Sequence, residues 1–201
     1  MKFWTFQNKY TLDMIIENGI YYPDFLTSNK RGNKTPLAYD FIKKAYEKNN
    51  DTMIKGVVFG LTSYNSLPIL TYNDYKNVII ESSMLGLSSD DDNTYILELE
   101  IDETEVDLTS CQFLNFMNLV YNLDMDSKFS DYKYSQLLYR DIFNCDNKFL
   151  DLMQSHIHYI DKSMIKGIYR SFSYNKYFNY EYYYGTCIDL EYYRKKLLDK
   201  K

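Results

Sequence analysis

Glycine, proline and cysteine are all scarce in this chain, which has seven, three and three of them in 201 residues. No segment matches G-x-x-x-x-G-K-[ST] or G-x-G-x-x-G, whose glycines let the backbone approach a phosphate group. H-E-x-x-H and G-x-S-x-G are missing too. The sequence therefore argues against phosphate-cradling loops, against that type of zinc peptidase and against nucleophile-elbow hydrolases.

The three cysteines, Cys111, Cys145 and Cys187, are odd in number and scattered, and none belongs to a C-x-x-C pair. A disulfide framework or a zinc ribbon needs a closer and more regular spacing. The sequence also has neither a secretory signal segment nor an apolar run of membrane-spanning length. We therefore expect a reduced, cytoplasmic protein that does not contact a membrane.

The net charge of −5 has the wrong sign for a protein that wraps a nucleic-acid backbone, because such a protein needs a positive face. Tyrosine is abundant, with 23 residues. Tyrosine rings can stack on unpaired bases or form a recognition surface for a protein. A protein partner is therefore the main expectation, and contact with a few unpaired bases stays open.

The segment "KFWTFQ" near the start alternates bulky and polar side chains. This alternation predicts a strand with Phe3, Thr5 and Gln7 on one face. Asn8 can cap the helix that follows, and Gly19 can supply the left-handed residue that ends it. The chain is thus expected to begin with a strand and a helix joined without a loop.

Further strands are predicted where segments are apolar or alternate, and further helices where apolar residues recur at helical spacing. The predicted strands are Ile54–Leu61, Tyr95–Asp102, Met153–Ile160 and Ile165–Phe172, and the predicted helices follow Pro36 and span Cys111–Leu123, Tyr134–Phe143 and Asp189–Lys200. The segment Asp74–Leu87 favours neither. Because helices separate the early strands while later strands are close in sequence, the pattern indicates an α+β fold. Residues 1–172 are expected to form a single domain, and 173–201 a tyrosine-rich extension that packs on the body or binds a partner.

Tyr95–Asp102 is the clearest strand in the sequence, and Glu98 and Glu100 lie on its polar face. They belong to an acidic run that continues beyond the strand. These carboxylates could form a solvated face, act as a pair in acid–base chemistry, or imitate a phosphate backbone toward a nucleic-acid-binding partner. The tyrosine-rich tail, with Tyr182 and Tyr183, is the second candidate contact surface.

Both histidines, His156 and His158, lie in "QSHIHYI", so that on a strand their imidazoles point the same way. Two imidazoles chelate a transition metal when a third ligand joins them, but no carboxylate stands at a spacing that marks it as that ligand. The pattern therefore predicts no metal site. A thiol activated by one of these imidazoles is a further arrangement that the composition allows.

Several segments, in one order along the chain, resemble an uncharacterised family of small bacterial and phage proteins that begin with a Leu/Phe-Trp-Thr-x-Gln strand. The similar segments are "FWTFQ" (3–7), "YILELEID" (95–102), "DLTSCQFLNFMNLVYN" (107–122), "YRDIFN" (139–144) and "MQSHIHYIDKSMIKGIY" (153–169). Trp4, Thr5, Gln7 and Gln154 are the positions where the chain meets the family's polar signature. This resemblance carries no function with it.

A more distant resemblance is to DNA-targeting ADP-ribosyltransferase toxins, which open with a His-x-Thr strand and a helix of Asn-Leu-x-x-Ile-Leu type. Leu12, Ile15, Ile16 and Gly19 are similar to that helix and its end. "GVVFGLTSYNSLPIL" is similar to the second core strand of these toxins, and "MQSHIHYIDKSMIKGIY" to their final pair of strands. The resemblance implies a split, twisted β-sheet of ADP-ribosyltransferase type flanked by helices.

The same resemblance implies that one shared cleft holds the site residues. They are Thr5, Gln7, Tyr22, Ser63 and Tyr64 for binding NAD, and Gln154 and His156 for catalysis. His156 stands where these toxins have a catalytic glutamate, and Thr5 stands where they have the histidine of the first strand. The imidazole does not supply the negative charge that acts as the nicotinamide bond loosens.

Two functions are compatible with the sequence. The first is a non-catalytic binding or inhibitor protein without a cofactor, of a kind that a phage could direct at a host defence or nucleic-acid enzyme, on a degenerate ADP-ribosyltransferase-like scaffold. Its partner-binding residues would be Glu98, Glu100, Tyr182 and Tyr183. The alternative is an NAD-dependent ADP-ribosyltransferase-like enzyme that modifies a protein or a nucleobase.

Overall fold

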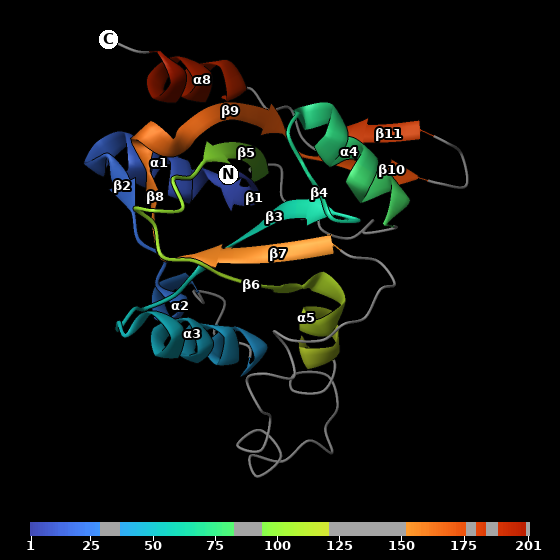
Figure 1. Ribbon diagram of the computed structural model, residues 1–201. Coiled ribbons are helices and arrows are strands. Elements are labelled where there is room, and N and C mark those ends of the chain that lie inside the picture. The colour runs from blue at the N-terminus through green and yellow to red at the C-terminus, as the bar shows by residue number, and fades with distance from the viewer. Residues whose placement is uncertain (29–36, 83–93, 121–151, 176–179, 184–188, 200–201) are drawn as a thin grey trace.

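The computed structural model describes residues 1–28, 37–82, 94–120, 152–175, 180–183 and 189–199, of which 27–28, 118–120, 173–175 and 180–183 are described by their backbone alone. These residues form an α+β fold around a mostly antiparallel sheet (Figure 1), which confirms the predicted fold class. The helix predicted for Tyr134–Phe143 lies outside the described residues, and so do Cys145 and Cys187.

The main sheet has the strand order β6-β7-β3-β1-β5-β9, and the short β4 pairs with the end of β3. All of these pairings are antiparallel. The strands are β1 (Lys2–Asn8), β3 (Val58–Tyr64), β4 (Leu67–Pro68), β5 (Thr94–Glu100), β6 (Thr109–Gln112), β7 (Leu152–Ile157) and β9 (Ile165–Arg170). The first strand of the sequence therefore lies inside the sheet, between strands from later in the chain.

β1 joins two halves of this sheet unequally. It pairs with β5 along its whole length, but with β3 at a single position, where Trp4 lies opposite Leu61. The strands β6, β7 and β3 therefore make one half of the sheet, and β1, β5 and β9 make the other, with a narrow junction between them.

The predictions for the start of the chain are confirmed. Asn8 caps α1 (Lys9–Asn18), because its Oδ1 accepts a hydrogen bond from the backbone N–H of Thr11 at 3.0 Å. Gly19 ends the helix with a φ of +77°, and its N–H donates to the carbonyl of Ile15 at 2.9 Å. Glycine adopts this left-handed conformation without the steric cost that other residues meet.

One face of the sheet carries Phe3 and is covered by α1 and by α8 (Leu190–Leu198). The Phe3 ring fills the space above Gly60, where even a Cβ atom would lie 2.1 Å from the ring. Gly60 therefore allows an aromatic side chain of β1 to cross over β3. The buried residues of this face include Phe3, Leu12, Ile15, Val58, Leu97, Leu99, Ile157, Ile168, Tyr193 and Leu197.

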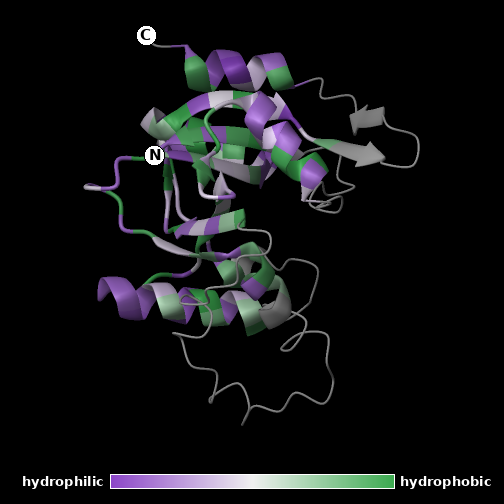
Figure 2. Ribbon diagram, turned by 45° about the vertical axis from the view of Figure 1, so that its right-hand side comes forward, coloured by the Kyte–Doolittle hydropathy of each residue, from purple (hydrophilic) through white to green (hydrophobic). Residues whose placement is uncertain are grey.

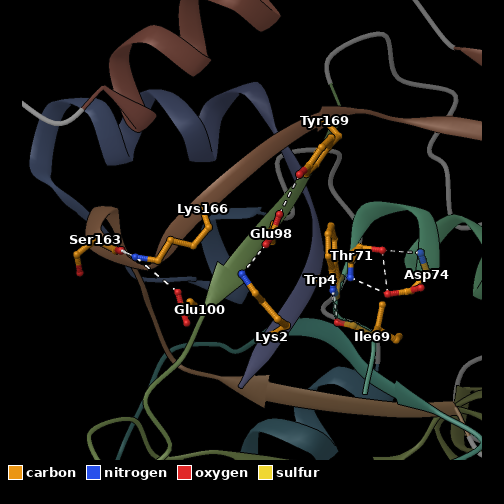
Figure 3. Close-up of polar contacts among 10 residues, drawn as sticks. All are labelled: Lys2, Trp4, Ile69, Thr71, Asp74, Glu98, Glu100, Ser163, Lys166 and Tyr169. Carbon is orange, nitrogen blue, oxygen red and sulfur yellow. Dashed lines mark hydrogen bonds and ion pairs between the residues drawn. The ribbon is translucent and has the colours of Figure 1, made fainter. Parts of the chain in front are cut away.

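The opposite face carries Trp4 and is covered by α3, α4 and α5. These helices span Leu37–Asn50, Tyr72–Glu81 and Phe113–Val120, respectively. The Trp4 ring stacks on Tyr75 with 5.3 Å between ring centroids, and its Nε1 donates to the carbonyl of Ile69 at 2.8 Å (Figure 3). The only tryptophan of the chain thus belongs to the core and satisfies its indole N–H there.

Several element boundaries differ from those that the sequence predicted. The strand predicted for Ile54–Leu61 is β3, which spans Val58–Tyr64, and the strand predicted for Met153–Ile160 is β7, which ends at Ile157, before His158.

The ambiguous segment contains α4, whose start is fixed by a capping box in which Thr71 and Asp74 each bond the other's backbone N–H (Figure 3). The helix predicted to begin at Cys111 instead begins at Phe113. Cys111 and Gln112 belong to β6, because they pair with β7.

Two small sheets and two short helical segments complete the described chain. β2 (Ile20–Tyr21) pairs with β8 (Ile160–Asp161), and β10 (Phe172–Asn175) pairs with β11 (Tyr180–Tyr183). The helix α2 spans Phe25–Ser28, and a 3-10 turn spans Lys162–Met164. The pairing of β2 with β8 places the end of α1 next to the segment that follows β7.

The C-terminal helix α8 packs on the body of the protein. Tyr193 and Leu197 are buried in the core, and the Tyr193 hydroxyl donates to Asp13 Oδ1 at 2.7 Å. Arg194 Nε donates to the carbonyl of Ile168 at 2.9 Å. Figure 2 shows hydrophobic residues gathered in the central strands and many hydrophilic residues on α8. Within the described ranges, no helix has the length and apolar character needed to cross a bilayer.

Candidate functional site

Thr5 and Gln7 share a face of β1 with Phe3, as predicted, and they form a short polar chain. Thr5 is 1% exposed, and its hydroxyl donates to the carbonyl of Phe59 at 2.7 Å. Gln7 Nε2 donates to the same hydroxyl oxygen at 2.8 Å. Because β1 and β3 pair at only one position, this side-chain bond ties the two halves of the sheet together next to the junction.

Gln154 and His156 form a second polar chain on β7, and both are buried, at 4% and 0% exposure. The Gln154 amide nitrogen lies 3.0 Å from His156 Nε2, and Thr109 Oγ1 lies 3.0 Å from His156 Nδ1. Since an amide nitrogen can only donate, Nε2 accepts and Nδ1 carries the proton. Burial lowers the pKa of His156 to about 3, so the imidazole is neutral at physiological pH.

These two polar chains lie on opposite faces of the sheet. Leu61 is paired with both Trp4 and Gln154, so Gln154 and His156 belong to the Trp4 face. Thr5 and Gln7 point to the Phe3 face. The structure therefore does not bring the two pairs into the shared cleft that the toxin resemblance implied. The catalytic and cofactor roles assigned to these residues stay predictions.

The other expected cofactor residues are also separated. Ser63 and Tyr64 follow a bulge in β3, and the Tyr64 side chain packs against the core cluster that contains Trp4. Tyr22 follows β2 and is 60% exposed, with its ring 6.0 Å from that of Tyr159. Of this set, Tyr22 is the residue that presents an open aromatic face.

A row of hydroxyl groups, which sequence patterns did not mark, crosses the first half of the sheet. Ser155 Oγ lies 3.0 Å from Thr62 Oγ1 and 2.7 Å from Ser110 Oγ, which joins β3, β7 and β6. Ser155 is 1% exposed. The row lies on the Phe3 face, because Ser155 is paired with Gly60. No local signal could have found it, since it depends on the register of three strands.

Glu98 and Glu100 lie on the same strand and in different environments (Figure 3). The Glu98 carboxylate lies 2.5 Å from Lys2 Nζ and accepts a hydrogen bond from the Tyr169 hydroxyl at 2.9 Å, and its side chain is 12% exposed. The Glu100 side chain is 58% exposed and lies 3.9 Å from Lys166. Glu98 is thus a structural link between β1, β5 and β9, whereas Glu100 is available for contact.

The expected contact residues in the tail are placed only by their backbone. Tyr182 and Tyr183 belong to β11, where they pair with Ser173 and Phe172 of β10. Their side chains lie outside the described residues. Their role in partner binding stays a prediction.

A pocket of about 850 Å³ lies where β5 ends, between the segment that follows it and the segment around the 3-10 turn. Its acidic lining residues are Glu100, Asp102, Glu103, Glu105 and Asp161. Two of these carboxylates also organise the local backbone. Asp102 Oδ1 accepts from the N–H of Thr104 at 2.9 Å, and Asp161 Oδ1 accepts from the N–H of Ser163 at 2.7 Å.

Two positive groups line this acidic pocket, Lys166 and the N-terminal ammonium of Met1, and the ammonium lies 3.7 Å from the Glu103 carboxylate. Lys166 Nζ donates to the carbonyl of Ser163 at 2.9 Å and lies 3.9 Å from Glu100 (Figure 3). A separation of 3.9 Å on an exposed pair neutralises little of the carboxylate's field. The remaining carboxylates make the pocket suitable for a cationic ligand.

The described residues contain no group of three or more histidine, cysteine, aspartate or glutamate side chains placed to hold a metal ion. Each imidazole has its own partners, and His158 Nδ1 lies 2.8 Å from the Tyr46 hydroxyl. Cys111 is buried, and burial raises the pKa of its thiol to about 12. A thiol with so high a pKa is a poor nucleophile at neutral pH.

Comparisons of this chain with family models, with curated proteins and with solved structures find no match.

The buried His156 predicts a loss of stability in mild acid. In the unfolded chain the imidazole binds a proton near pH 6.5, whereas in the folded chain it does so only near pH 3. Between these values the unfolded state binds more protons, so the free energy of unfolding falls by about 1.4 kcal/mol for each pH unit below 6.5. Urea unfolding at about pH 7 and about pH 5 should therefore show a drop of about 2 kcal/mol from this residue.

The control for this measurement is His156→Asn, which lacks the titrating group. This variant should be less stable than the wild type near neutral pH, because it breaks the Gln154–His156–Thr109 chain. It should lose about 2 kcal/mol less than the wild type between the two pH values. Equal losses in both proteins would show that His156 is not held neutral by burial.

The different environments of Glu98 and Glu100 predict different costs for the same substitution. Glu98→Gln weakens a mostly buried ion pair with Lys2 and should lower the free energy of unfolding by about 1–3 kcal/mol. Glu100→Gln should change it by less than about 0.5 kcal/mol, because the pair with Lys166 is long and exposed. Chemical denaturation measures both values, and equal costs would contradict this assignment.

Proposed function

We propose that this chain is a non-catalytic binding protein that captures a partner protein through the acidic pocket at the end of β5. The observation that carries the proposal is the pocket itself, with five carboxylates among its lining residues. Glu103 and Glu105 are exposed at this site. The Glu103 carboxylate lies 3.7 Å from the N-terminal ammonium of Met1, whereas the Glu105 carboxylate forms no hydrogen bond or ion pair with another described residue. The five carboxylates outnumber the two positive groups of the lining, Lys166 and the N-terminal ammonium, and a concave surface with this negative excess favours a partner with a basic surface.

The burial of the toxin-like polar residues supports a binding role over a catalytic one. Thr5, Gln154 and His156 are nearly inaccessible to solvent, and each is paired with a neighbour inside the protein. A catalytic group must reach the reacting atoms of a substrate. The neutral His156 also lacks the charge that an ADP-ribosyltransferase glutamate supplies. An NAD-dependent enzyme is the alternative that the experiments below separate from the proposal.

The division of the sheet supports a degenerate ADP-ribosyltransferase-like scaffold. β1 and β3 share a single pairing position, so the sheet is divided into two halves, and a divided sheet is compatible with the split sheet that the toxin resemblance implies. On such a scaffold, the acidic surface would imitate a phosphate backbone. The proposed partner is therefore a nucleic-acid-binding protein, such as a host defence or nucleic-acid enzyme, and the chain would act as its inhibitor.

Charge reversal at the pocket tests this proposal. The variant Glu103→Lys/Glu105→Lys changes two exposed residues of the pocket, and Glu17→Lys/Glu81→Lys changes two exposed residues on α1 and α4 by the same total charge. Immobilised wild type and the α1/α4 variant should capture the same nucleic-acid-binding protein from a bacterial lysate, and added duplex DNA should release it. The pocket variant should lose this capture. Undiminished capture by a folded pocket variant would contradict the proposal.

Addition of NAD separates the enzyme alternative from the binding protein. A ligand that binds only the folded state raises the melting temperature. Millimolar NAD should leave the melting temperature of this protein unchanged and should not be consumed. A rise in melting temperature that Gln7→Ala removes, together with release of nicotinamide, would favour the enzyme over the binding protein.

A further inference from the structure

Three aromatic side chains meet beside the acidic pocket, where the two-stranded β2–β8 sheet ends. The register pairs Tyr21 with Ile160, so the next step of the ladder sets Tyr22 opposite Tyr159. The His158 ring lies 6.4 Å from the Tyr22 ring and 4.6 Å from the Tyr159 ring. Tyr159 itself lines the acidic pocket. The group formed by Tyr22, His158 and Tyr159 is called the aromatic seat below.

The hydrogen bonds of Tyr46 fix the protonation of His158. The Tyr46 hydroxyl lies 2.7 Å from the carbonyl oxygen of Asp107 and 2.8 Å from His158 Nδ1. A carbonyl oxygen can only accept, so the hydroxyl proton is directed to Asp107. His158 Nδ1 must therefore donate to the hydroxyl oxygen, and Nε2 keeps its lone pair.

His158 Nε2 is thus an acceptor held in a fixed position. Among the described residues, His158 makes no hydrogen bond besides the one to Tyr46. Burial lowers the pKa of His158, although the Asp107 carboxylate opposes this effect. The imidazole is therefore neutral near pH 7 and can accept a hydrogen bond from a ligand.

The surroundings of the seat are negative. Burial raises the pKa of Tyr159, and the carboxylates of Asp161, Glu105 and Asp107 raise it further. Two of these carboxylates, those of Asp161 and Glu105, line the pocket together with Tyr159, so negative charge lies near the Tyr159 ring. An anionic ligand such as a phosphate would be repelled here, whereas a cation would be attracted.

We propose that the aromatic seat binds an arginine side chain of the partner protein. A guanidinium is planar and stacks on aromatic faces, and its N–H groups can donate to a neutral imidazole and to carboxylates at the same time. The exposed face of Tyr22, the acceptor Nε2 of His158 and the nearby carboxylates match these three properties. A lysine ammonium is a compact charge that uses the carboxylates but not the planar stack. This inference rests on the proposed function, because it names the side chain that the acidic pocket receives.

Fluorescence anisotropy with labelled hexa-arginine and hexa-lysine peptides tests the seat on the full chain. At physiological salt, hexa-arginine should bind at least about 5-fold more tightly than hexa-lysine. Tyr22→Leu and Tyr159→Leu should each reduce the affinity for hexa-arginine to about that for hexa-lysine. The matched control is Tyr192→Leu, which removes a tyrosine of α8 that is 49% exposed and should leave both affinities unchanged.

The outcomes separate the seat from the proposed function. Equal affinity for the two peptides, weakened only by Glu103→Lys/Glu105→Lys, would overturn the arginine seat and leave the acidic pocket as a general cation site. No binding of either peptide, while the pocket variant still loses the captured protein, would also overturn the seat alone. Loss of discrimination in the Tyr192→Leu control would overturn the seat, because the effect would not be local.

Discussion

The bond between the Thr5 hydroxyl and the Phe59 carbonyl holds together a sheet that is otherwise joined at one pairing position. β1 pairs fully with β5 but touches β3 in the ladder only at Trp4. Next to this position, the Phe3 ring packs over Gly60 on one face of the sheet, and the Trp4 indole packs against α4 on the other face. The polar residues Thr5 and Gln7 of β1 are therefore engaged in holding the two halves of the sheet together.

This constraint buries most of the residues that resemble the polar residues of ADP-ribosyltransferase toxins, which supports the proposal that the chain binds its partner at another surface. Thr5 and Gln154 lie on opposite faces of the sheet, and both are almost completely buried. The proposed binding surface lies where the end of β5, the β2–β8 sheet and the 3-10 turn come together. There the acidic pocket and the aromatic seat lie side by side, since Tyr159 belongs to both.

The sequence predicted much of the local structure and little of the site. The alternation in β1 and β5, the Asn8 cap and the Gly19 stop are set by neighbouring residues, and the structure confirms them. The predicted start of α5 was wrong because Cys111 and Gln112 pair with β7 and so belong to a strand. The prediction of a shared cleft was wrong because it depends on the order of the strands and on the face of the sheet to which each side chain points. Both are set by long-range strand pairing, which a single sequence does not reveal. The contact between the rings of Tyr22 and Tyr159 could not be predicted for the same reason.

The separation of the two polar chains is the central claim, and proton–proton NOEs measure it directly. Thr5 lies opposite Leu97 on the same face, so the Thr5 methyl protons should show cross-peaks to the Leu97 methyl groups. The Gln154 side-chain amide should show cross-peaks to the His156 ring, 3.0 Å away between nitrogens. A cross-peak between the Thr5 methyl and the Gln154 amide would place them in one cavity and would contradict this account.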